Sequence, residues 1–444
     1  MLTLSQDKVI KLMKNKGINT QKELADEIGI SSSHLSKILS DDYDFVKSRV
    51  RDICNYLNVE INELLEKKIK EQVENQNINL KLFEHTENYV DINKIVSNKE
   101  YSSVELFAGA GGLALGLEKS GFKTLALVEN NHYAAETLRS NRPDWNVVEE
   151  DIERVMDQGI THYINKPLKN KELDLLSGGY PCQSFSYAGN KLGLKDTRGT
   201  LFYYFAEALK ELQPKLFLAE NVRGLKSHDG GRTLKTMIKV FENEGYDIKF
   251  KVLNSINYNV AQKRKRLFII GIRKDLKEKY NLEYKFPKPL DSKLVLKDVI
   301  KNVPKSEGAT YSENKKEVLE KVPPGGCWRD LPESVAKEYM GKSYYSSGGR
   351  TGMARRLSWD EPSLTILTSP GQKQTERCHP EEIRPFTVRE SARIQSFDDH
   401  WKFEGPITSK YKQIGNAVPV QLAKAVGLSL VKILNQINKK RDRN

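Results

Sequence analysis

The feature that most constrains this chain is an alternation of short apolar segments with amphipathic ones, which begins at residue 101. Strand–helix–strand repeats of this length build a mainly parallel sheet covered by helices. The expected strands are Val104–Phe107, Thr124–Val128, Asn146–Glu149, Leu173–Leu176, Leu216–Ala219 and Leu267–Ile272. The pattern therefore predicts an α/β fold, in which ligands bind at the carboxyl ends of the strands.

The residues before this domain have a helical pattern instead of alternating strands and helices. The stretch TQKELADEIGISSSHLSKIL has Leu24, Ala25 and Ile28 at helical spacing, and the period resumes at Leu35 after Gly29. Two short helices around a glycine turn are typical of the helix-turn-helix; the alternative is a generic helical hairpin. Residues 1–65 resemble the lambda-repressor/Cro type of DNA-binding domain, an all-α unit. The resemblance places four residues in the major groove, namely Ser32, Ser33, Ser36 and Lys37.

Charge and cysteine content restrict the partners. The formal charge of +13, from 72 basic and 59 acidic residues, suits a polyanionic partner, and a soluble protein that happens to be basic is the open alternative. The four cysteines form no CxxC pair and suit neither a zinc site nor a disulfide framework. The N-terminus lacks the apolar core of a signal peptide, and we find no apolar run of about 20 residues. We expect a cytoplasmic protein with reduced thiols, no metal and no membrane partner.

A glycine-rich turn follows the first expected strand in VELFAGAGGLALGLEKSGF. Gly109, Gly111 and Ala114 satisfy G-x-G-x-x-A, and Glu129 lies 20 residues after Gly109, where nucleotide-binding folds place a ribose-binding acid. This predicts an adenosine-type cofactor, with NAD or a ligand-free turn as alternatives. Asp151 follows another expected strand, so it could bind an adenine amino group or simply cap a helix.

The string GGYPCQSFS places Cys182 directly after a strand, two glycines and Pro181. It therefore lies at the ligand-binding edge of the predicted sheet. A free thiol has a pKa near 8.5, which must fall for the thiolate to act at neutral pH. Nearby basic residues favour the thiolate, although a single cysteine is usually inert; they are Lys191, Lys195 and Arg198.

Six motifs occur in one order: FAGAGG, PCQ, AENVRGL, QKRKRLFIIG, TVRESARIQSF and QIGNAVPVQLAKAVG. In this order they resemble the DNA (cytosine-5)-methyltransferases over roughly residues 102–437. The resemblance implies an S-adenosylmethionine-dependent methyltransferase with a Rossmann-like sheet. The implied domains are a linker at 66–100, a catalytic domain at 101–286 completed by 405–444, and a smaller irregular target-recognition lobe at 287–404. An NAD oxidoreductase would explain only the glycine loop and Glu129.

The resemblance also implies roles. Cys182 would add to C6 of cytosine, Glu220 would engage N3 and the exocyclic amine, Arg264 would hold O2, and Arg266 would orient Glu220 or the loop. Without the family, Glu220 would be read as a surface acid or half of a salt bridge. S-adenosylmethionine, which leaves as S-adenosylhomocysteine, would contact Phe107, Ala108, Gly109, Gly111, Gly112, Glu129, Asn130, Asp151, Ile152, Pro181, Asn416 and Val418.

Double-stranded DNA is the implied substrate, and the target base must leave the stack. We expect residues 183–200 to form a lid over it. The basic residues of the second lobe, Arg356 and Lys373 among them, are more typical of phosphate contacts than of base contacts. The DNA-contacting residues outside the helix-turn-helix are expected to be Gln183, Arg198, Arg350, Arg355 and Thr365.

The biological setting implied by the resemblance is protection of host DNA from a cognate restriction endonuclease. The N-terminal unit would then either repress its own operon or only add nonspecific DNA affinity. We expect a nucleoid-associated protein that is monomeric on its methylation site and dimeric, through the N-terminal unit, on an operator.

Overall fold

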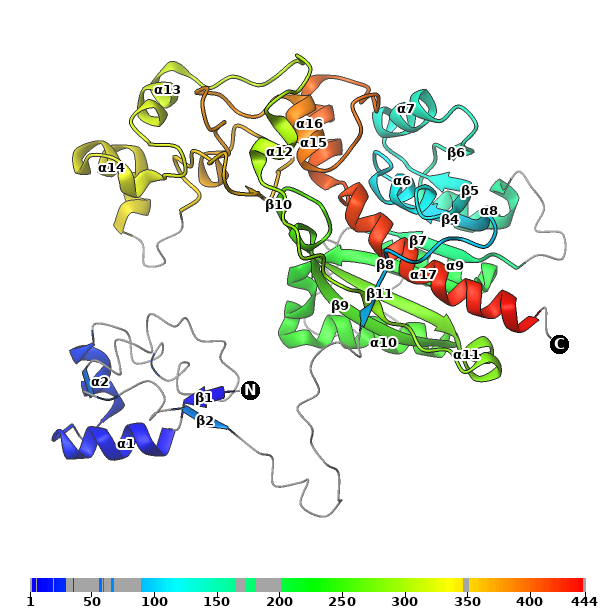
Figure 1. Cartoon of the computed structure of the whole chain (residues 1–444), viewed down its shortest axis with the longest axis horizontal. Coiled ribbons are helices and arrows are strands. Elements are labelled where there is room, and N and C mark those ends of the chain that lie inside the picture. The colour runs from blue at the N-terminus through cyan, green and yellow to red at the C-terminus, as the bar shows by residue number, and fades with distance from the viewer. Residues whose placement is uncertain are drawn as a thin grey trace. The chain divides into compact units, whose positions relative to one another are not determined.

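A computed structural model describes residues 2–4, 6–18, 20–28, 35, 56–57, 59, 65–67, 89–164, 172–180, 201–345 and 351–441. The chain divides into two compact units, Met1–Phe83 and Glu84–Asn444 (Figure 1).

The N-terminal unit contains α1 (Gln6–Asn15) and α2 (Gln21–Glu27). Thr20 caps α2, and its hydroxyl and the Glu23 carboxylate form a capping box. A short antiparallel pair, β1 (Leu2–Leu4) with β2 (Leu65–Lys67), joins the ends of the unit. Three positions of the predicted pattern, Leu24, Ala25 and Leu35, are buried in its core, and Ile28 packs against it partly buried. The other buried core residues are Val9, Met13, Ile18 and Leu57. The four residues expected in the DNA groove, Ser32, Ser33, Ser36 and Lys37, lie outside the described residues.

The second unit is built on a seven-stranded sheet in the order β6-β5-β4-β7-β8-β11-β9 (Figure 1). Its strands are β4 (Tyr101–Leu106), β5 (Phe122–Val128), β6 (Val147–Val148), β7 (Leu175–Gly178), β8 (Leu216–Val222), β9 (Tyr246–Asn254) and β11 (Lys265–Arg273). The five neighbouring strands β6, β5, β4, β7 and β8 are parallel, whereas β11 is antiparallel to both β8 and β9. The α/β fold is therefore confirmed. Strand β9 was not among the expected strands, although the alternation of apolar with charged residues in YDIKFKVLN is typical of a half-buried strand.

Helices cover both faces of this sheet. One face packs against α6 (Gly112–Glu118), α11 (Lys274–Tyr280) and α17 (Val420–Arg441), and the other against α8 (Ile152–Gln158), α9 (Leu201–Leu212) and α10 (Arg232–Asn243). A Cβ on Gly116 would come within 2.4 Å of the Ala423 Cβ, so α6 and α17 cross closely only because residue 116 is glycine. The segment Ile407–Arg441 passes a length and apolarity test for a membrane span, but 78% of its most apolar window is buried, as in a core helix.

The domain boundaries differ from those expected. The second unit includes β3 (Tyr89–Val90), part of the expected linker, which pairs with β12 (Phe286–Pro287). Residues 386–403, expected in the second lobe, pack against the central domain, since Phe397 and Trp401 share a core with Ala114 and Leu138. The helices of this region are α7 (His132–Asn141), α12 (Leu296–Ile300), α15 (Val388–Ile394) and α16 (Ile407–Asn416).

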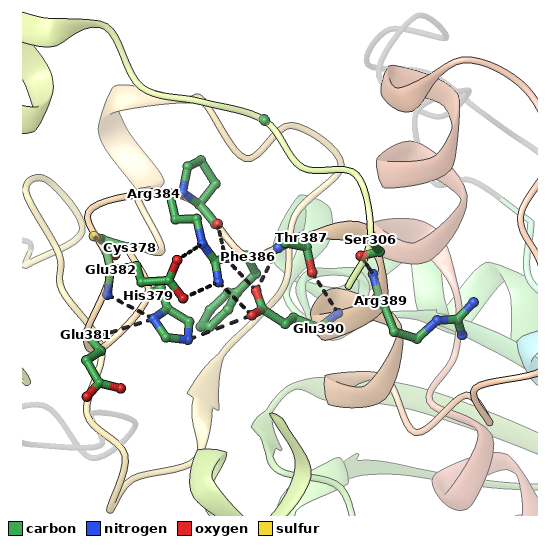
Figure 2. Close-up of polar contacts among 12 residues, drawn as sticks. Ser306, Cys378, His379, Glu381, Glu382, Arg384, Phe386, Thr387, Arg389 and Glu390 are labelled. Carbon is green, nitrogen blue, oxygen red and sulfur yellow. Dashed lines mark hydrogen bonds and ion pairs between the residues drawn. The ribbon is translucent and has the colours of Figure 1, made fainter. Parts of the chain in front are cut away.

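The irregular lobe has a small core of its own, formed by residues between Tyr311 and Cys378, with α13 (Glu313–Glu320) and α14 (Glu333–Met340). Figure 2 shows the ionic cluster that follows it in the chain. Arg384 donates to both oxygens of the buried Glu390 at 2.8 Å, and Glu390 also completes the capping box of α15. His379 accepts backbone N–H groups through Nδ1, and burial lowers its pKa, so the ring is neutral at pH 7. This cluster joins the lobe to α15.

Candidate active site

The predicted functional residues follow strands that end at one edge of the sheet. The carboxyl ends of β4, β5, β7 and β8 lie at this edge because these strands are parallel. The antiparallel β11 begins there, with Arg266 paired in register to Val222. Sequence segments more than a hundred residues apart therefore meet at one place.

The glycine loop between β4 and α6 has three constrained positions. Phe107 has a φ of 58°, a left-handed conformation rare for a bulky residue, and Gly109 and Gly111 have φ values of 55° and 81°. A Cβ on Gly111 would meet Leu138 at 2.7 Å, and one on Gly112 would meet the Val418 carbonyl oxygen at 2.4 Å. Gly111 and Gly112 are thus required by protein packing. A Cβ on Gly109 would meet nothing within 4 Å, which leaves the space that a ligand needs.

Glu129 faces this loop, as its spacing predicts. Its Oε2 accepts the Gly109 N–H at 2.7 Å, and its Oε1 accepts the Asn131 N–H at 2.8 Å. Burial raises the pKa of Glu129, and these two backbone hydrogen bonds oppose the rise because they stabilise the carboxylate. The carboxylate is held at the rim of the loop and keeps lone pairs for a ligand hydroxyl.

Asp151 caps α8, with its Oδ1 accepting the Glu153 N–H at 2.9 Å. Its Oδ2 lies 3.4 Å from the Asn130 amide nitrogen. The helix-cap alternative therefore applies, and it brings Asn130 and Ile152 to the same edge as Glu129.

Glu105 belongs to this region and was missed in the sequence. It lies inside β4, and burial raises its pKa to about 8, while Ser177 Oγ donates to its Oε2 at 3.3 Å. A carboxyl group with that pKa is mostly protonated at pH 7. The available signal was an acid within the apolar run VELF, which a buried strand rarely tolerates unless the acid has a partner.

The segment that leads to Cys182 is anchored beside Glu220. Asn221, the next residue on β8, donates from its side chain to the Tyr180 carbonyl oxygen at 2.9 Å. A Cβ on Gly179 would lie 3.1 Å from Glu220 Oε2, so the chain passes the carboxyl group directly. The predicted residues Pro181, Cys182, Gln183, Arg198 and Arg350 themselves lie outside the described residues.

Glu220 and Arg266 form a buried ion pair. Arg266 Nε lies 2.9 Å from Glu220 Oε1, and the two side chains are only 15% and 11% exposed. This contact lacks hydrogen-bond alignment, so Oε1 has no hydrogen-bond partner among the described residues. Burial raises the pKa of Glu220, and the nearby arginines only partly oppose it. The Glu220 carboxyl group therefore holds a proton more readily than the carboxyl group of an exposed glutamate does.

Arg264 is placed differently from its expected role. Its Nη1 donates to the Ile366 carbonyl oxygen at 3.2 Å, and its Nη2 donates to those of Gly415 and Asn416 at 2.8 and 3.4 Å. The side chain is fully buried, and only Nε lacks a partner among the described residues. This geometry does not support the expectation that Arg264 holds the base O2, because the guanidinium is buried and three of its five N–H groups donate to backbone carbonyl oxygens. Arg266 is the arginine at the carboxyl group.

A cavity of about 430 Å³ opens next to this ion pair. Among the described residues, none that lines it is acidic; its walls are Val222, Arg223, Gly224, Asn254, Lys263, Lys265, Arg266 and Thr365. A larger cavity, about 580 Å³, is lined by residues of α17 and of the segment before β4, and none of the predicted site residues lines it. The basic cavity is the one that suits a nucleic-acid strand.

Among the DNA-contacting residues expected in the second lobe, Thr365 borders the basic cavity and donates its hydroxyl to the Lys263 carbonyl oxygen at 3.0 Å. Arg355 is half-buried, and its Nε has no partner among the described residues. Arg356 is not available, since its guanidinium donates to the carbonyl oxygens of Val322, Pro380 and Glu381. Arg355 is therefore the better candidate for a DNA contact.

The chain is similar to known methyltransferases. The Type II methyltransferase M.Sau96I of Staphylococcus aureus is 53% identical over 437 residues, which cover 98% of this chain and all of that protein. M.Eco47II of Escherichia coli is 56% identical over 353 residues, covering 78% of this chain and 82% of that protein. A solved structure of an E. coli prophage-encoded protein, described as a DNA modification methyltransferase, aligns with a TM-score of 0.55 at 25% identity and covers 76% of this chain and 99% of that one.

Two families match the two units. Residues 8–69 match a helix-turn-helix domain. Residues 101–432 match the C-5 cytosine-specific DNA methylases, and this match spans every motif that meets at the sheet edge. The chain is therefore a DNA (cytosine-5-)-methyltransferase of the C-5 cytosine-specific DNA methylase family, of the restriction-modification type, with an N-terminal helix-turn-helix domain.

Proposed function

We propose that this enzyme methylates C5 of a cytosine flipped out of a specific double-stranded DNA sequence, through a covalent bond between Cys182 and C6. The observation that supports this most directly is the buried Glu220–Arg266 pair beside the anchored Gly179–Tyr180 segment, two residues before Cys182. An acid and a nucleophile at one sheet edge suit addition to an electron-poor ring.

Glu220 has the properties that this addition needs. When the Cys182 thiolate forms a bond to C6, the electron pair of the C5–C6 double bond is displaced toward N3, which must take up a proton. The raised pKa of Glu220 supplies an acid at that atom, and its second oxygen can accept from the exocyclic amine. Arg266 would hold the resulting carboxylate. C5 would then bond to the methyl group supplied by the donor. Loss of the C5 proton, departure of the thiolate and return of the N3 proton to the Glu220 carboxylate would restore the aromatic ring.

The glycine loop fits S-adenosylmethionine as the methyl donor. Gly109 leaves open space at the loop, and Glu129 would offer lone pairs to a ribose hydroxyl. Asn130 and Asp151, which contact each other, would face the adenine. Val418 borders the loop from the other side, since its carbonyl oxygen lies next to Gly112, and Asn416 ends α16 two residues earlier. The donor would supply an electrophilic methyl group and leave as S-adenosylhomocysteine.

The target cytosine would be flipped out of the helix, since neighbouring bases cover the faces of its ring in stacked DNA. The basic cavity beside Arg266 would receive the strand that carries the flipped base. The setting we propose is a cytoplasmic, nucleoid-associated enzyme that acts as a monomer on its site and protects that site from a cognate restriction endonuclease.

Sequencing of DNA from a host without cytosine methylation tests the reaction. We expect expression of the chain to place 5-methylcytosine at one short motif. Modification of adenine, or of cytosine N4, would contradict the mechanism, because neither position needs addition to C6. An empty vector supplies the background.

We further propose that the N-terminal unit represses the operon that encodes this chain, acting as a dimer on an operator. The full chain carrying Cys182→Ser should protect DNA upstream of its gene from nuclease digestion. Lys37→Glu in the same chain should remove that protection and leave binding to the methylation site unchanged. If both proteins give identical protection patterns, the unit adds only nonspecific affinity.

A further inference from the structure

We propose that Gln395 is a positioning residue for methyl transfer, which with Gln262 and Arg264 aligns the cofactor side of the site with the DNA side. The inference rests on the proposed function for what those two sides bind. The three side chains form a buried hydrogen-bonded bracket that joins segments far apart in the sequence.

Gln262, in β10 (Gln262–Lys263), forms the DNA side of the bracket. Its Oε1 accepts the Ile366 N–H at 2.9 Å, and its Nε2 donates to Gln395 Oε1 at 2.7 Å. The strand β10 also pairs with β13 (Ser363–Leu364), directly before Thr365. Gln262 thus fixes the short segment that borders the basic cavity.

Gln395 forms the cofactor side. Its Nε2 donates to the carbonyl oxygens of Ile414 and Ala417 at 2.7 and 3.1 Å, where α16 ends and α17 begins. The backbone carbonyl oxygen of Gln395 accepts the Val420 N–H at 3.2 Å, and Ser396 Oγ accepts the Gln421 N–H at 3.0 Å. Gln395 and Ser396 therefore hold both ends of the loop that carries Asn416 and Val418.

Arg264 forms a second link between these two segments, because its two Nη groups donate to the carbonyl oxygen of Ile366 on one side and to those of Gly415 and Asn416 on the other. Gln262 and Gln395 are fully buried, and every polar atom of their side chains has a partner. A fully satisfied network in a buried site resists displacement, since any shift leaves a buried polar group unpaired. Neither glutamine is placed to touch a reacting atom, so the bracket acts through position.

A shift of the cofactor side relative to the DNA side is expected to slow methyl transfer. A misplacement of about 1 Å between reacting groups can slow a reaction about a hundredfold. Removing the Gln395 amide cuts the link from Gln262 to the Asn416–Val418 loop and leaves Arg264 as the remaining side-chain link between Ile366 and that loop. The rate of transfer should therefore fall more than the affinity for either substrate.

Gln413 provides a matched control on α16. It is also a buried glutamine with a complete set of partners, namely Thr137 Oγ1 at 2.7 Å, the Glu404 carbonyl oxygen at 2.9 Å and Ser409 Oγ at 3.2 Å. It joins α16 to α7, outside the bracket. Replacement by methionine removes the same chemical group from a similar environment at both positions.

The test compares Gln395→Met with Gln413→Met and the wild-type chain. Single-turnover transfer from labelled S-adenosylmethionine is measured on DNA bearing the motif that the wild type methylates, and the amplitude gives the active fraction. We expect Gln395→Met to lower the rate constant per active site about tenfold or more, within the range for lost alignment. The KM for each substrate should change less, and Gln413→Met should stay within about twofold of the wild type.

Three outcomes would overturn the inference: an unchanged rate per active site in Gln395→Met, equal slowing by Gln413→Met, or a loss confined to the active fraction. If Gln395→Met does not fold, Gln262→Met cuts the same bracket from the DNA side and is expected to give the same result. A wild-type chain that transfers no methyl group to DNA would contradict the proposed function instead.

Discussion

Replacement of Cys182 by serine is expected to lower methyl transfer on the order of a thousandfold or more, as removal of a covalent nucleophile does elsewhere. A serine hydroxyl is not ionised at neutral pH, whereas a thiol with a pKa near 8.5 needs only a modest shift to become a nucleophile. Transfer is measured with labelled S-adenosylmethionine. Affinities for cofactor and DNA should remain, because the change of one atom removes little contact area.

Cys54→Ser is the matched control, since Cys54 belongs to the N-terminal unit. It should methylate at the normal rate. A Cys182→Ser chain that methylated as fast as this control would rule out covalent catalysis by Cys182. Trapping of a stable complex on DNA with 5-fluorocytosine at the target, which blocks loss of the C5 substituent, should succeed in the control and fail in Cys182→Ser.

Glu220→Gln is expected to slow transfer by about 10² to 10⁴-fold, the range for loss of a general acid. Glutamine preserves one acceptor and one donor toward the cytosine edge, so DNA binding should persist while proton transfer to N3 is lost. Burial raises the pKa of Glu220 above its ordinary value of 4.5, and its acid form is lost as the pH rises through that raised pKa. The ratio of wild-type to Glu220→Gln rates should therefore decrease with increasing pH, and the ionisation of Cys182 cancels from that ratio.

Glu172→Gln is the control for this prediction. Glu172 also pairs with arginines, Arg273 and Arg441, but it precedes β7 and so lies at the opposite edge of the sheet. Its replacement should affect stability and leave the rate per folded enzyme unchanged. A similar loss of rate in both variants would mean that Glu220 acts only through folding.

The two arginines of QKRKR show where reasoning from sequence stops. Spacing places Arg264 and Arg266 on the same side of an extended segment, but spacing cannot say which of them faces a base. In the fold, Arg264 is buried against three backbone carbonyl oxygens, whereas Arg266 lies across from β8 beside Glu220. The carbonyl oxygens come from residues 366, 415 and 416, more than a hundred positions away.

The sequence alone determined the α/β class, the strands that carry the motifs, the glycine loop with Glu129, and the helix that contains Leu24 and Ala25, which is α2 of the N-terminal unit. These depend on local periodicity and on short motifs, which are properties of neighbouring residues. Only the tertiary structure decided that burial raises the pKa of Glu105 to about 8, that residues 386–403 pack with the central domain, and that Gln262, Arg264 and Gln395 form one bracket. Those facts depend on burial and on contacts between distant segments, which no local pattern encodes.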